Sequence, residues 1–243
     1  MTRITRRTLG TLLVGSLPVL TRRAALATGP APERRDLKIG LIGAGQVGGT
    51  LAGLWVAAGY HVMLSARSED EAREAAARLG PSASAGTPAQ AAAYGDVVVL
   101  AVPFRAIPSL GQQLSGVVKG KILLDPSNFY SFRDGAIAAT AAQDGAGPTT
   151  SRYFPGARVV RAFNSIDMSV LRSEARRAAP LLAVPVAGDD PAAVSTVADL
   201  VRAAGFDPVI TGNLASSVLF QPGGPGFEVR ANAAELRSTL GIR

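Results

Sequence analysis

A glycine-rich turn near the start of the chain limits its possible folds more than any other feature. The turn follows an apolar run at residues 37–43, which is typical of a buried strand. It matches the pattern G-x-G-x-x-G as Gly43-Ala44-Gly45-Gln46-Val47-Gly48. Apolar residues then recur at helical spacing from residue 46 to residue 58. This pattern, placed between a strand and a helix, is the signature of a dinucleotide-binding turn.

Each glycine of the motif has its own physical task. Gly43 permits the tight turn, Gly45 lets a pyrophosphate approach the backbone, and Gly48 lets the helix pack closely on the strand. The helix N-terminus presents unpaired N–H groups and a partial positive charge to phosphates. We therefore expect residues 43–48 to bind a dinucleotide. The alternative is a glycine-rich helix start without a ligand.

Downstream of the turn, short apolar runs alternate with helical patterns. The runs are apolar on both faces, which favours a mostly parallel sheet covered on both sides; they lie at residues 61–65, 96–102, 121–125, 158–163, 180–186 and 206–210. The alternation predicts an α/β fold: a Rossmann-like, doubly wound, mostly parallel sheet with helices on both faces. We expect one such domain at residues 37–243 with a short C-terminal extension, and a surface excursion at residues 131–155.

The end of the second predicted strand indicates which cofactor the turn would bind. An NAD enzyme usually carries an acidic residue there, whereas an NADP enzyme needs a cation for the 2′-phosphate. This chain reads Ser65-Ala66-Arg67-Ser68. Arg67 can form a charge-assisted fork to phosphate, with hydroxyl donors at Ser65 and Ser68. We predict a preference for NADP(H); the alternative is that Arg67 pairs with an acid of the following Glu69-Asp70-Glu71.

The first 27 residues have the pattern of an export signal. They contain five arginines and no acid. Arg3, Arg6 and Arg7 precede an apolar stretch at residues 9–20 that is too short to span a bilayer, and Arg22 and Arg23 follow it. Thr5-Arg6-Arg7-Thr8-Leu9 is similar to the twin-arginine motif. We expect export to the periplasm, no stable membrane span, and a linker at residues 28–36. An uncleaved anchor or a basic tail are the alternatives.

The composition of the chain excludes several kinds of catalytic and metal site and argues against a nucleic-acid partner. The chain has no cysteine and one histidine, which excludes thiol nucleophiles, thiolate zinc sites and two-histidine metal clusters. Most of the net charge of +7 lies in residues 1–27, so the remaining chain gives no case for nucleic acid. We expect no metal site and no nucleic-acid partner. A bound cofactor must then supply the reactive group.

Several blocks of the sequence resemble the NADP-dependent oxidoreductases typified by coenzyme F420-dependent NADP reductase. The ordered blocks carry this resemblance; they lie at residues 39–52, 62–67, 96–103, 121–128, 159–165 and 186–190. The resemblance implies direct hydride transfer with little need for a protein acid or base, so no side chain is assigned as catalytic with certainty. It also implies that Val102, Pro103 and Phe104 lie beside the nicotinamide and ribose.

Two asparagines complete the expected site. By the same resemblance, Asn128 and Asn164 lie at neighbouring strand ends and face the crevice; ligands of open α/β sheets bind at those ends. The alternatives are turn-forming asparagines that bond their own backbone, and ordinary core packing for Phe104.

We therefore expect an NADP(H)-dependent oxidoreductase that acts on a small redox substrate such as a flavin or the deazaflavin F420. The tail at residues 220–227 does not match a known substrate segment, which leaves the acceptor open. A non-catalytic dinucleotide-binding module and a pyrroline-carboxylate- or 6-phosphogluconate-type dehydrogenase are the alternatives. A homodimer is a further hypothesis, because the short tail offers little to cover the crevice.

Overall fold

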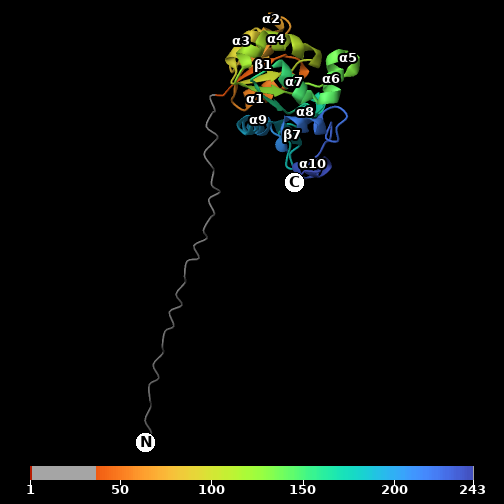
Figure 1. Ribbon diagram of the computed structural model, residues 1–243. Coiled ribbons are helices and arrows are strands. Elements are labelled where there is room, and N and C mark those ends of the chain that lie inside the picture. The colour runs from red at the N-terminus through yellow and green to blue at the C-terminus, as the bar shows by residue number, and fades with distance from the viewer. Residues whose placement is uncertain (2–36, 243) are drawn as a thin grey trace. The chain divides into compact units, whose positions relative to one another are not determined.

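The computed structural model describes Met1 and residues 37–242. The expected export signal and linker, apart from Met1, lie outside the described residues. The described chain forms an eight-stranded sheet with the order β3-β2-β1-β4-β5-β6-β7-β8 (Figure 1). The strand bounds are β1 Lys38–Ile42, β2 His61–Ser65, β3 Ala83–Ala85, β4 Val97–Leu100, β5 Ile122–Asp125, β6 Arg158–Arg161, β7 Ala183–Gly188 and β8 Asp207–Gly212.

Helices connect most of these strands. The α-helices are α1 Gln46–Ala57, α2 Glu69–Leu79, α3 Pro88–Tyr94, α4 Ile107–Val118, α5 Ser131–Asp134, α6 Ala136–Asp144, α7 Ala146–Tyr153, α8 Met168–Glu174, α9 Pro191–Ala203 and α10 Ala233–Leu240, with 3₁₀ helices η1 Phe104–Ala106 and η2 Leu214–Phe220. Glycine or a capping residue marks many ends, such as Ser68 before α2 and Asn232 before α10.

The sheet is parallel except between β6 and β7, which pair antiparallel. The first five strands in chain order have the 3-2-1-4-5 arrangement of a doubly wound nucleotide-binding sheet. The predicted Rossmann-like α/β fold with a mostly parallel sheet is therefore confirmed. The same order brings the carboxyl ends of β1, β4, β5 and β6 to one edge.

Apolar side chains fill both faces of the sheet. On one face, Leu41 and Ile39 of β1 pack with Leu51 and Trp55 of α1 and with residues of α8 and α9. On the other face, strand residues pack with α3, α4, α6 and α7. The Trp55 indole N–H donates to the Leu200 carbonyl oxygen at 3.0 Å, which ties α1 to α9. Helices therefore cover both faces, as the apolar strands predict.

Residues 131–155 are helical and partly buried. The expectation of a surface excursion is wrong for their second half, since Ala146, Gly147, Thr149 and Thr150 of α7 are buried. Small side chains there allow α7 to pack against β6 and η2.

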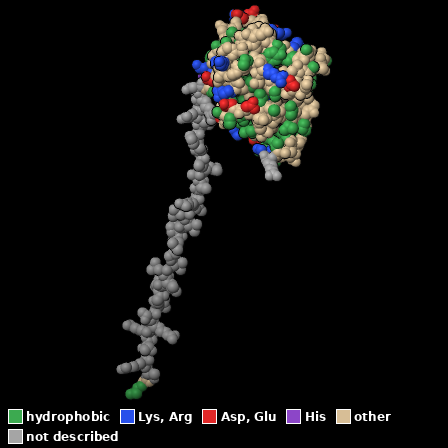
Figure 2. Space-filling model, viewed as in Figure 1, with side chains coloured by type: hydrophobic (Ala, Val, Ile, Leu, Met, Phe, Trp, Pro, Cys, Tyr) green, Lys and Arg blue, Asp and Glu red, His purple; other side chains and the backbone are tan. Residues whose placement is uncertain are grey.

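Charged side chains of both signs are interspersed on the face displayed in Figure 2. Within residues 37–242, no helix combines the length and the apolar character that a bilayer crossing needs.

Candidate functional site

The glycine-rich turn joins the end of β1 to the start of α1. Gly43 has a φ of +100°, and a Cβ there would lie 2.3 Å from the Ala101 carbonyl oxygen. A Cβ on Gly48 would lie 2.0 Å from the Gly43 carbonyl oxygen, so the helix and the turn touch through backbone. A Cβ on Gly45 would meet nothing within 4 Å. Gly43 and Gly48 thus serve close packing, whereas Gly45 borders open space where a ligand can approach the backbone.

Backbone bonds fix the turn against the second strand. The N–H groups of Gly43 and Ala44 both donate to the Ser65 carbonyl oxygen at 3.0 Å. Helix α1 starts at Gln46 with no side-chain cap and no acid in its first turn. Its first N–H groups and its positive end therefore remain available to an anion.

A cavity of about 490 Å³ extends from the turn toward the end of β2. Arg67, Arg78 and Arg105 line it, together with Val102 and Pro103. Sequence reasoning missed Arg78 and Arg105. Arg105 follows the β4 end by a few residues and is the one that a search for cations near strand ends would find.

Arg67 and the two serines at the end of β2 have partners within the protein. Arg67 Nη2 pairs with Glu71 Oε1 at 3.2 Å, which is the alternative interpretation of this arginine; its side chain is 92% exposed. Ser65 is buried, and its Oγ donates to the Leu41 carbonyl oxygen at 3.4 Å. Ser68 Oγ accepts the Glu71 N–H and caps α2. Exposed ion pairs are weak, so Arg67 can exchange Glu71 for a phosphate, while Ser65 and Ser68 hold the local fold.

A second cavity of about 380 Å³ lies over the carboxyl ends of β4, β5 and β6. Seven expected residues line it, namely Val102, Pro103, Asn128 and Asn164, together with Gly45, Gln46 and Val47 of the turn. Phe104 does not share this position, because it is fully buried and packs edge-on against Phe129 with ring centroids 6.0 Å apart.

Asn128 and Asn164 bond each other across neighbouring strand ends. Asn164 Nδ2 also donates to the Phe220 carbonyl oxygen at 2.8 Å. Phe163, just before Asn164, has a left-handed φ of 66° and packs edge-on against Trp55 and Phe206. An aromatic residue rarely adopts this conformation, so core packing holds the bend that places Asn164 beside the cavity.

A polar group from the segment after β5 lines the same cavity and was not expected from the sequence. The Arg133 guanidinium bonds both carboxylate oxygens of Asp134 and donates to the Asn128 carbonyl oxygen at 2.7 Å. It also lies over the Tyr130 ring, 4.9 Å from its centroid. Burial, and then the negative charge of Glu228, raise the pKa of Tyr130 above its ordinary value. Tyr130 therefore remains a neutral hydroxyl at physiological pH.

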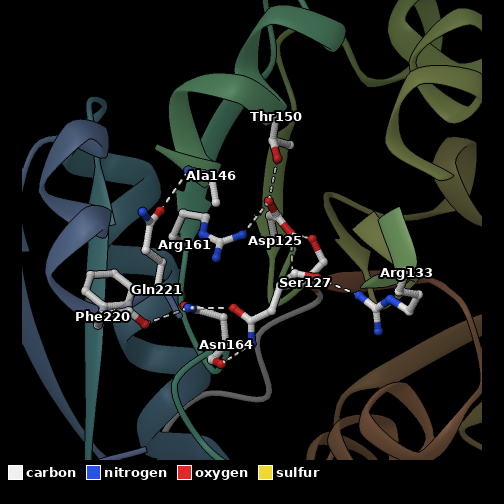
Figure 3. Close-up of polar contacts among 10 residues, drawn as sticks. Asp125, Ser127, Arg133, Ala146, Thr150, Arg161, Asn164, Phe220 and Gln221 are labelled. Carbon is white, nitrogen blue, oxygen red and sulfur yellow. Dashed lines mark hydrogen bonds and ion pairs between the residues drawn. The ribbon is translucent and has the colours of Figure 1, made fainter. Parts of the chain in front are cut away.

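A buried ion pair supports the floor of this cavity. Arg161 Nη1 lies 2.8 Å from Asp125 Oδ2, and both side chains are fully buried. Asp125 also accepts hydrogen bonds from the Ser127 N–H and from the Thr150 hydroxyl (Figure 3). These bonds fix the direction in which the chain leaves β5 toward Asn128.

The arrangement fits a dinucleotide that spans the two cavities. The open backbone at Gly45, the uncapped start of α1 and the three arginines suit phosphate groups. The second cavity offers amide groups and apolar walls at the carboxyl edge of the sheet, where such folds place the reacting ring.

Comparisons with known proteins agree with this geometry. Residues 38–129 match the family described as NADP oxidoreductase, coenzyme F420-dependent. Metalloreductase STEAP3 of Rattus norvegicus is 29% identical over 202 residues, which cover 82% of this chain and 39% of that protein. The chain thus spans about two fifths of the length of that curated relative.

Two crystal structures share most of the described fold. The hypothetical protein SMa0349 of Sinorhizobium meliloti is 29% identical with a TM-score of 0.71, over 81% of this chain and 95% of that one. A protein from Arthrobacter sp. FB24, provisionally assigned as an F420-dependent NADP reductase, is 27% identical with a TM-score of 0.65, over 85% and 96%. The chain therefore has the Rossmann-like fold of NADP oxidoreductases, and its glycine-rich part, residues 38–129, matches their coenzyme F420-dependent family.

Proposed function

We propose that the protein is an NADP(H)-dependent oxidoreductase that transfers hydride between the nicotinamide and a small redox acceptor, such as a flavin or the deazaflavin F420. The observation that carries the proposal is the continuous path from a cation-lined cavity, past an open glycine turn, to a cavity at the carboxyl edge of the sheet.

The first cavity supports NADP rather than NAD. Arg67, Arg78 and Arg105 offer three guanidinium groups where the adenosine ribose would lie, and a 2′-phosphate suits such groups. Glu71 and Glu74 also line this cavity and would repel the phosphate. The exposed Arg67–Glu71 pair leaves the Arg67 guanidinium free to turn toward a phosphate.

The second cavity supports hydride transfer with the protein in a binding role. When bound, the nicotinamide supplies the hydride itself. Val102 and Pro103 would provide an apolar wall for the ring, while Asn128 and Asn164 would orient its carboxamide. Tyr130, Arg133 and Glu228 remain on the acceptor side as polar contacts.

Titration of the full-length protein with NADPH and NADH tests the cofactor. NADPH should bind more tightly, and Arg67→Ala should reduce the ratio of the two affinities by roughly 10-fold or more. An Arg73→Ala variant, which removes a cation paired with Glu69 and Asp70 on the same helix, should leave the ratio unchanged. Equal affinity of the wild type for both cofactors would contradict the assignment.

An acceptor screen under anaerobic conditions tests the reaction. FMN, F420, ferric chelates and quinones should be compared for NADPH oxidation at 340 nm. Steady turnover with one of them supports the enzyme. Tight NADPH binding without turnover would instead indicate the non-catalytic dinucleotide-binding module.

We also propose that residues 1–27 direct export by the twin-arginine route to the periplasm. The support is the sequence Arg6-Arg7 ahead of a short apolar run. Arg6→Lys with Arg7→Lys should move the protein from the periplasmic to the cytoplasmic fraction.

We further propose that the protein forms a homodimer. Light scattering of the purified protein, which measures its molar mass in solution, tests this proposal.

A further inference from the structure

Arg172 occupies an unusual electrostatic position at the glycine-rich turn. It lies in α8, far from the turn in sequence, yet its Nη2 donates to Gln46 Oε1 at 2.7 Å. Gln46 is the first residue of α1, directly after Gly45. The contact therefore places a guanidinium beside the positive end of a 12-residue helix.

Two neighbouring positive charges repel each other unless an anion binds between them. Acids favour helix N-termini and cations favour C-termini, but the first turn of α1 has no acid and its N-cap has no side-chain acceptor. Among the residues that the structure describes, the hydrogen-bond partner of the Arg172 side chain is the neutral Gln46 amide. Arg172 thus adds positive potential at the point where the helix already has it.

The space around Arg172 can receive a ligand. Arg172 lines a cavity of about 400 Å³ together with Gly45, Gln46, Thr50 and Arg78, and none of the described residues that line it is acidic. Arg78 also lines the cavity that we assign to the adenosine end, so the two cavities share a cation and adjoin at the turn.

We propose that Arg172 binds the pyrophosphate of the dinucleotide and that Gln46 holds its guanidinium in place before the cofactor arrives. This inference rests on the proposed function. A guanidinium forms charge-assisted bonds to phosphate oxygens that are stronger than its bond to a neutral amide. The pyrophosphate is common to NADP(H) and NAD(H), so Arg172 sets the affinity for both, whereas Arg67 sets the choice between them.

Fragments of the cofactor separate these two roles. Adenosine 2′-monophosphate carries the 2′-phosphate without a pyrophosphate, and 2′-phospho-ADP-ribose carries both. Binding of these fragments, NADPH and NADH to the full-length protein should be measured by calorimetry for the wild type, Arg172→Ala, Arg172→Lys and Arg67→Ala. Arg202→Ala is the matched control, because Arg202 also lies in the last turn of a helix and pairs with Asp199 on the surface.

We expect the Arg172 and Arg67 variants to weaken different sets of ligands. Arg172→Ala should weaken NADPH, NADH and 2′-phospho-ADP-ribose by about 10-fold each and leave adenosine 2′-monophosphate within twofold. Arg172→Lys should recover part of the loss, since it keeps the charge without the fork. Arg67→Ala should weaken adenosine 2′-monophosphate and NADPH but leave NADH unchanged, and Arg202→Ala should change none of them.

Two results would overturn the proposal. One is that Arg172→Ala binds NADPH and NADH as the wild type does. The other is that it weakens adenosine 2′-monophosphate as much as NADPH, which would show a general charge effect. If the wild type binds neither NADPH nor NADH, the proposed function itself fails, and this outcome is distinct from the other two.

Discussion

Asn128 and Asn164 exchange hydrogen bonds across the ends of β5 and β6. Asn128 Nδ2 donates to the Asn164 carbonyl oxygen at 2.6 Å, and Asn164 Nδ2 donates to Asn128 Oδ1 at 3.2 Å. The exchange fixes two strand ends that are far apart in sequence at the same cavity, so each asparagine positions the other for a ligand.

Asn164→Ala should therefore affect both stability and binding. It removes two donated hydrogen bonds and leaves the Phe220 carbonyl oxygen without its donor, which should lower the free energy of unfolding by about 1–3 kcal/mol. NADPH binding should weaken as well. Urea unfolding and NADPH titration measure the two effects. Thr140→Ala, which loses an exposed bond within α6, should change the unfolding energy by under about 0.5 kcal/mol; an equally small change for Asn164→Ala would contradict the prediction.

Glu71→Gln should strengthen NADPH binding. The Glu71 carboxylate pairs with Arg67 and lines the cavity where the 2′-phosphate would lie, so it competes for the guanidinium and repels the phosphate. Removal of an exposed pair of this kind should raise NADPH affinity by about two- to fivefold and leave NADH affinity unchanged. Glu69→Gln removes the same charge from a neighbouring pair with Arg73 and should have a smaller effect. A gain shared equally by NADH would rule out this explanation.

Arg161→Met should destabilise the fold strongly. The substitution keeps most of the side-chain volume but leaves the fully buried Asp125 carboxylate without its cation. An uncompensated buried charge costs about 3–5 kcal/mol, which urea unfolding would detect. The surface variant Arg202→Met breaks an exposed pair and should cost less than about 1 kcal/mol. Similar losses for the two variants would show that the buried pair does not support the cavity floor.

The acid stability of the protein should depend on Asp134. Burial by itself raises the pKa of Asp134, but bonds from the Arg133 side chain and from the Tyr130 and Arg105 N–H groups outweigh it and hold the pKa below the ordinary 3.8. A lowered folded pKa stabilises the protein above the unfolded pKa, and this stabilisation is lost as the pH falls through the folded value.

Asp134→Asn should therefore be less stable than the wild type at pH 7, and the difference should shrink at pH 3. Urea unfolding at both pH values measures it. Asp70→Asn, on the exposed face of α2, should show a small difference at either pH. A gap that stays constant from pH 7 to pH 3 would exclude Asp134 as the titrating group.

The fold could be predicted from the sequence because its strands and its glycine-rich turn are each specified by short stretches of neighbouring residues. The β4 run at residues 97–100 is buried throughout, and the motif at residues 43–48 dictates its own backbone through Gly43 and Gly48. Asn128 and Asn164 were expected at one crevice, and the structure brings them together. The Arg67–Glu71 contact is likewise local, because it joins residues four apart in sequence at the start of α2, and the sequence offered it as an alternative.

The remaining site residues depend on packing between distant segments. Arg172 reaches the turn only because α8 packs against α1, and Glu228 reaches the second cavity from the C-terminal segment. Phe104 follows two cavity residues in sequence, but η1 turns its ring into the core. A single sequence carries no signal for such contacts, because each depends on how helices and loops that are distant in sequence pack against the sheet.

The antiparallel pairing of β6 and β7 is followed by a C-terminal segment that contributes to the second cavity. After β6 the chain reverses, and its C-terminal segment returns to the site, where the Glu228 N–H donates to the Ser165 carbonyl oxygen at 2.9 Å. The first, arginine-lined cavity is thus built from residues before β5, whereas Glu228 contributes to the second cavity from the last part of the chain. Under the proposed function, changes to the segment around Glu228 would alter the choice of acceptor without altering the choice of nucleotide, so this segment is the place to engineer a new acceptor.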